Sequence, residues 1–80
     1  MKIKIEELYK IIAKSLNVSV SKINSNVKDV DFEEWDSLGQ LSIINSLDKK
    51  FKGKLKLDEI SSATNVKSII KFLEKKKYLN

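Results

Sequence analysis

Apolar residues recur at steps of three and four along most of this chain, the spacing that places side chains on one face of an α-helix. The first such set comprises Ile5, Leu8, Ile12 and Leu16. It predicts a helix of about three turns, which Asn17 could end because asparagine tolerates the left-handed backbone conformation found after helices. Helical spacing predominates over the alternation typical of strands, so the sequence predicts an all-α fold.

A second helix is predicted from about Ser37 to Phe51, where the helical spacing resumes. Its inner face is predicted to consist of Leu41, Ile44, Leu47 and Phe51. Gly53 suits a left-handed turn just beyond the end of this helix, because glycine has no Cβ to clash there.

Two further helices complete the predicted fold. Residues 57–60 suffice for one or two turns, and Thr64 or Asn65 is then expected to cap a last helix. The predicted inner face of that helix consists of Val66, Ile69, Ile70 and Leu73. The architecture expected for residues 1–80 is therefore a single domain, a small bundle of three main helices plus one short helix.

The connection from Asn17 to Asp36 is unusually long, since loops beyond about 12–15 residues are uncommon in compact domains. Its apolar residues are expected to anchor it against the core. They are Val18, Val20, Ile23, Val27, Val30 and Phe32.

The composition argues against several kinds of chemistry. The 80 residues include no cysteine and no histidine, so a thiolate metal site, a disulfide and the usual general base are all absent. A chain of this length buries only about 60% of its unfolded surface, which leaves little room for an enclosed active site. We expect no metal site and no enzymatic activity.

The location is also an expectation from composition. The N-terminal residues lack the apolar core of a signal peptide, and no stretch approaches the roughly 20 apolar residues of a membrane span. We expect a cytoplasmic monomer without stable membrane insertion.

The segment Trp35-Asp36-Ser37-Leu38-Gly39-Gln40 places a serine at the start of the predicted second helix. Ser37 followed three positions later by Gln40 fits a capping box, which would make Ser37 a purely structural residue. A hydroxyl at this position would also be exposed, and the helix N-terminus favours a negatively charged phosphate. The same serine is therefore a candidate site for covalent modification.

Order and spacing along nearly the whole chain resemble the acyl carrier protein family. The segment from Trp35 to Phe51 looks like the family's second helix, with Asp-Ser-Leu at its start, a leucine nine positions after the first, and a phenylalanine four later. Residues 57–60, followed by 63–66 and the apolar residues beyond them, look like its third and fourth helices.

The resemblance implies a function for these residues. Ser37 would carry a 4′-phosphopantetheine arm, and Asp36 would assist its Mg²⁺-dependent transfer from coenzyme A. Leu38, Trp35 and Asp48 would contact partner enzymes. The arm would hold an acyl or aminoacyl group as a thioester. The implied partners are a phosphopantetheinyl transferase and an acyl-activating ligase, acyltransferase or synthase.

The charge pattern departs from that of housekeeping fatty-acid carriers, which are acidic along the second helix. This chain has a net charge of +5. Lysines cluster toward and beyond the end of the predicted helix, at Lys49, Lys50, Lys52, Lys54 and Lys56. Acidic residues precede it, at Asp29, Asp31, Glu33, Glu34 and Asp36. We therefore expect a specialised carrier that works poorly with fatty-acid elongation enzymes, because Lys49, Lys50 and Lys52 would face their basic patches.

Two alternatives remain open. The lysines also suit a small basic helical module that binds nucleic acid or an anionic membrane through phosphate contacts. The lack of arginine and the acidic loop beside Ser37 argue against nucleic acid as a partner. An unmodified docking domain of carrier fold is the second alternative, because fold does not fix function.

Overall fold

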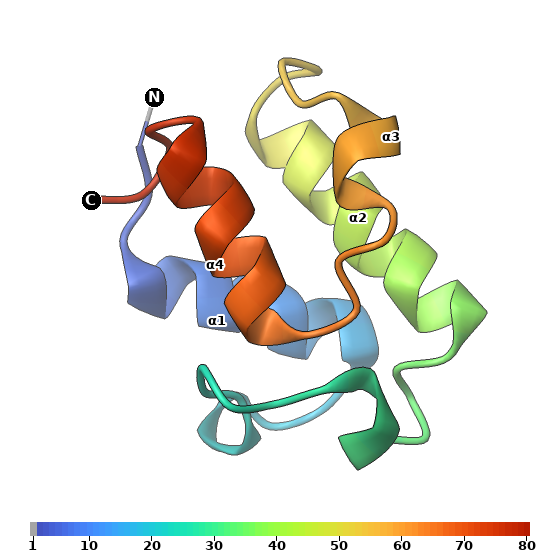
Figure 1. Ribbon diagram of the computed structural model, residues 1–80. Coiled ribbons are helices and arrows are strands. Elements are labelled where there is room, and N and C mark those ends of the chain that lie inside the picture. Colours follow the sequence, from blue (N-terminus) through green and yellow to red (C-terminus); the bar gives the residue numbers. More distant parts are fainter. Residues whose placement is uncertain (1) are drawn as a thin grey trace.

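The computed structural model describes residues 2–80 and confirms a small all-α bundle. Its three main helices are α1 (Ile5–Leu16), α2 (Ser37–Lys50) and α4 (Val66–Lys75), and the short helix is α3 (Leu57–Ile60). Figure 1 shows α1 crossing behind α4, with α2 and α3 on the opposite side of the molecule from the two termini. None of the helices in residues 2–80 is long and apolar enough to cross a bilayer.

Helix α1 has the predicted bounds. Asn17 takes the left-handed conformation, with φ of 58°, and its N–H bonds back to carbonyls of the last turn. Leu8, Ile12 and Leu16 are buried as expected, whereas Ile5 is half-buried. Acidic residues in the first turn complement the partial positive charge of the helix N-terminus.

The inner face of α2 differs from the prediction at one position. Leu47 is fully buried and Ile44 and Phe51 are buried, but Leu41 is 53% exposed and Ile43 occupies the core instead. At about 100° per residue, Leu41 lies roughly 120° around the helix from Leu47, whereas Ile43 lies only about 40° away. The expectation that Leu41 faces inward was therefore wrong.

The end of α2 joins the last part of the chain. Phe51 follows the helix directly and its ring stacks on Tyr78, with centroids 4.7 Å apart and planes inclined by 19°. Gly53 adopts φ of 77°, which confirms the predicted left-handed turn. Phe51 therefore packs against the segment that follows α4 and helps to close the bundle.

The cap of α4 is Asn65, whose Oδ1 accepts a hydrogen bond from the Ser68 N–H at 2.8 Å. The remaining candidate, Thr64, does not supply it. On the predicted inner face of α4, Val66, Ile69 and Leu73 are buried and Ile70 is half-buried.

The long connection contains two 3₁₀ turns, η1 (Val20–Lys22) and η2 (Asp29–Asp31). Ile23 and Val27 are buried anchors as expected, and Val18 and Phe32 pack against the core while partly exposed. The prediction that Val20 and Val30 also anchor the loop was wrong, because they are 44% and 84% exposed.

Backbone hydrogen bonds hold this connection to the entry of α4. The Asp29 N–H donates to the Thr64 carbonyl and the Val66 N–H donates to the Val27 carbonyl, each at 2.9 Å. Residues 27–29 of the loop are therefore fixed beside the start of α4.

Candidate functional site at the start of helix α2

Ser37 is the first residue of α2, and Asp36 caps the helix. The Asp36 Oδ1 accepts a hydrogen bond from the Gly39 N–H at 2.8 Å, while the Asp36 backbone is extended. The predicted capping box between Ser37 and Gln40 is therefore wrong, because an aspartate one position earlier satisfies the first turn. Ser37 has an exposed side chain that the cap does not use.

Gln40 has a different structural role, as a bridge between three segments. Its Oε1 accepts a hydrogen bond from the Trp35 indole Nε1–H at 2.6 Å. Its Nε2 donates to the carbonyls of Ser61 and Ala63, at 3.2 and 3.0 Å. This side chain ties the loop before α2 to the connection between α3 and α4.

Trp35 was expected to contact partner proteins, and the structure corrects this. Its side chain is only 4% exposed, and its one polar group already bonds to Gln40. A buried indole with a satisfied N–H has no surface to offer a partner. Trp35 instead belongs to the core, and its bond to Gln40 joins the residues before α2 to that helix.

Gly39 allows the loop to pass close to α2. A Cβ at this position would lie 2.1 Å from the Glu34 carbonyl oxygen and 2.9 Å from the Leu16 Cδ2. The sequence analysis assigned no role to Gly39, and it did not predict that Gln40 bridges three segments. The close approach at Gly39 could have been predicted. A glycine inside a helix lowers the stability of that helix, so its presence indicates that another segment passes close by.

The exposed part of the site is a short continuous surface. Asp36, Ser37 and Leu38 are all exposed, Leu38 by 74%. Beside them lies a depression of about 410 Å³, whose lining includes Ser37, Asp29 and Asp36. The serine hydroxyl is thus accessible to another protein, and it has no histidine in the sequence to activate it.

Asp48 does not join this cluster. It is partly exposed near the end of α2, and eleven residues at about 1.5 Å each place it roughly 16 Å along the axis from Ser37.

Lys50 also differs from expectation, because its Nζ forms an ion pair with Glu7 of α1. Its charge is therefore partly compensated, unlike that of an unpaired lysine.

No protein-family model and no solved structure matches this chain. The class of protein is defined by the geometry itself, as a small all-α bundle that presents an exposed serine in the first turn of a main helix.

Replacing Gln40 tests the bridge. Gln40→Ala is expected to lower the free energy of unfolding by about 1–3 kcal/mol, because it leaves the buried Trp35 N–H without its acceptor. Gln40→Glu keeps an acceptor for the indole but places a carboxylate oxygen against the carbonyl oxygens of Ser61 and Ala63, so it is expected to destabilise at least as much as Gln40→Ala. Urea unfolding followed by the fluorescence of the single tryptophan measures both. Unchanged stability in both variants would contradict the bridge.

Proposed function

We propose that this chain is an acyl or aminoacyl carrier, with its cargo held as a thioester on a 4′-phosphopantetheine arm attached to Ser37. The observation that carries the proposal is the exposure of the Ser37 side chain in the first turn of α2. It agrees with the site that the resemblance to acyl carrier proteins implies, in a bundle with the same order of helices.

The residues around Ser37 fit such an arm. The first turn of α2 directs backbone N–H groups and partial positive charge toward a phosphate on the serine. The depression of about 410 Å³ beside Ser37 leaves room for the start of a flexible chain. The bond of the Asp36 carboxylate to the Gly39 N–H holds that carboxylate next to the serine, where it would assist the transfer.

The chain is not an enzyme in this proposal. The Ser37 Oγ attacks the phosphate of coenzyme A that bears pantetheine, the pyrophosphate bond breaks, and adenosine 3′,5′-bisphosphate leaves. The base that takes the serine proton belongs to a phosphopantetheinyl transferase, since the sequence has no histidine. When bound, the arm supplies a thiol that carries the cargo. Leu38 would contact partner enzymes, which include a ligase, acyltransferase or synthase.

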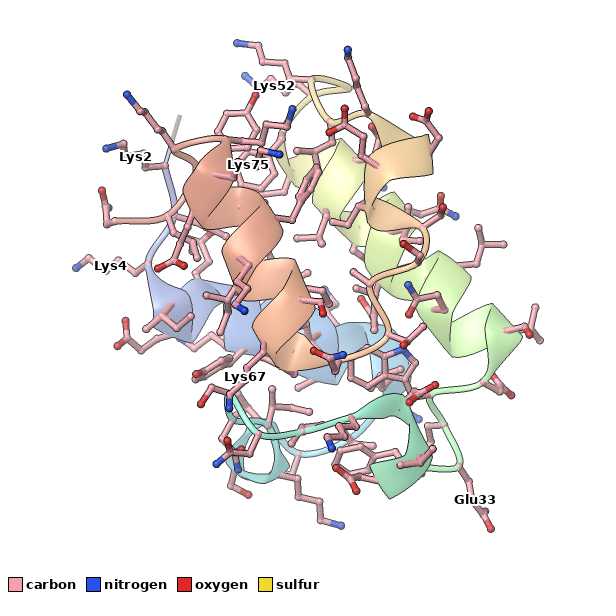
Figure 2. All side chains as sticks on the ribbon, in the orientation of Figure 1. Lys2, Lys4, Glu33, Lys52, Lys67 and Lys75 are labelled. Carbon is pink, nitrogen blue, oxygen red and sulfur yellow. The ribbon has the colours of Figure 1, made fainter. Side chains whose placement is uncertain are left out.

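The charge pattern supports a specialised member rather than a housekeeping fatty-acid carrier. Figure 2 shows Glu33 and Lys52 at opposite ends of the molecule. Acidic groups therefore precede α2 and basic groups follow it, and α2 does not have the uniformly acidic surface of a housekeeping carrier. The proposal places the protein in the cytoplasm as a monomer.

Loading with coenzyme A tests the proposal. Incubation of the full chain with coenzyme A, Mg²⁺ and a broad-specificity phosphopantetheinyl transferase is expected to add one phosphopantetheine, measured by intact mass. Ser37→Ala is expected to abolish the increment and to change the free energy of unfolding by less than about 0.5 kcal/mol, because Ser37 is exposed and does not cap α2.

The matched control is Ser42→Ala, another exposed serine on α2, which is expected to load like the native chain. Failure of the native, folded chain to load with several transferases would reject the carrier function. That outcome would favour the unmodified docking domain.

A further inference from the structure

A second concave surface lies between α1 and α2, and it shares no residue with the depression beside Ser37. It is a groove of about 810 Å³. Its lining includes Lys14, Ser15, Ser42, Asn45, Lys49 and Lys52. Lysines from both helices therefore converge on one groove.

Two serine hydroxyl groups, those of Ser15 and Ser46, belong to the lining of this groove. The Ser15 Oγ lies 2.7 Å from the Ile11 carbonyl oxygen and 3.0 Å from the Ser46 Oγ, within hydrogen-bond distance of both. The contact between Ser15 and Ser46 links α1 to α2 within the groove.

Three of the lysines lack an acidic partner. Lys50 pairs with Glu7 of α1. Within residues 2–80, neither that ion pair nor the one between Lys76 and Glu59 involves Lys14, Lys49 or Lys52. The groove therefore has an excess of positive charge, which an anionic partner would compensate.

We propose that the groove between α1 and α2 docks an acidic segment of a partner protein, an amphipathic helix with carboxylates on one side. The carboxylates complement Lys14, Lys49 and Lys52. Leu38 lies four positions before the lining residue Ser42, so it is on the same side of α2, and it is 74% exposed and offers an apolar contact one turn beyond the groove. Charge complementarity together with an exposed apolar side chain distinguishes a protein segment from a free phosphate.

The acidic loop at the end of the molecule opposite Lys52 favours a short acidic segment as the ligand over a long polyanion such as a nucleic acid. Figure 2 shows Glu33 projecting from the acidic loop at the end of the molecule opposite Lys52. A nucleic acid that extended from the lysines along α2 toward Ser37 would meet this acidic loop and be repelled. The proposal does not require modification of Ser37, so its failure and that of the carrier function are separate results.

Nuclear magnetic resonance of the full ¹⁵N-labelled chain tests the docking surface. The probe is a synthetic helical peptide with glutamates along one side and leucines along the adjacent side, so that both can face the groove. Its addition at low salt is expected to shift the amide signals of Lys14, Ser15, Ser42, Asn45 and Lys49. A peptide with glutamines in place of the glutamates is expected to bind much more weakly. Added salt is expected to weaken the binding of the acidic peptide.

Charge reversal locates the site. A triple variant that combines Lys14→Glu, Lys49→Glu and Lys52→Glu is expected to bind the acidic peptide roughly tenfold or more weakly than the native chain. The matched control reverses three exposed lysines of α4, Lys67, Lys71 and Lys75, with the same change in net charge. This control is expected to bind within about twofold of the native chain because screening limits distant charges.

Several outcomes would overturn the proposal. Equal weakening in the two triple variants, with circular dichroism showing both folded, would mean that only net charge matters. Equal binding of the glutamine peptide would remove the role of the carboxylates. Tighter binding of anionic lipid vesicles than of the acidic peptide, at the same lysines, would assign the groove to a membrane surface instead.

Discussion

Leu47→Ala is expected to lower the free energy of unfolding by about 2–5 kcal/mol. The Leu47 side chain is completely buried on the inner face of α2, so its loss removes apolar burial and leaves a cavity. At about 0.05–0.15 kcal/mol per residue, an 80-residue chain has only about 4–12 kcal/mol in total. Phe51→Ala is expected to cost a similar amount, because it also removes the stacking on Tyr78.

Leu41→Ala is the matched control, since it deletes the same atoms from the same helix. Leu41 is 53% exposed, so its loss is expected to change the free energy of unfolding by less than about 1 kcal/mol. Urea unfolding followed by circular dichroism compares the two variants. If Leu41→Ala cost as much as Leu47→Ala, the rotation of α2 about its axis would differ from that described.

Gly39→Ala is expected to destabilise the protein by roughly 1–3 kcal/mol. On an open helix surface the same change would stabilise by up to about 1 kcal/mol, because alanine is the better helix former. Here the new Cβ would meet the Glu34 carbonyl oxygen, a backbone atom that no side-chain rotation can move away. The sign of the effect therefore reports the close approach of the loop to α2.

Thermal unfolding measures this sign. The indole N–H signal of Trp35 is expected to shift in Gly39→Ala, because the displaced loop carries Trp35 away from Gln40. A Gly39→Ala protein more stable than the native chain would show that the loop does not pack against this turn.

Local patterns in the sequence were sufficient to predict the helices and several of their ends. The spacing of Leu8, Ile12 and Leu16 defines α1, and Asn17 ends it as expected. Asn65 and Gly53 mark the start of α4 and the turn after α2. These features depend on residues within a few positions of one another, so the sequence contains the necessary information.

The candidate site was predicted only in part. The position of Ser37 in the first turn of α2 follows from the motif and the apolar pattern after it. The bridge made by Gln40 depends on Ser61 and Ala63, more than twenty positions along the chain. A local pattern contains no information about which distant carbonyls will lie within reach.

The sequence by itself determined that this chain forms an all-α bundle and that Ser37 begins its second main helix, because helical periodicity and capping are local properties. Only the tertiary structure decided which side of α2 faces the core. Leucines at 38 and 41 and apolar residues at 43, 44 and 47 offer that helix two possible inner faces. Packing against α1 and the rest of the core selected the face with Leu47, and it left Leu38 and Leu41 exposed beside the serine.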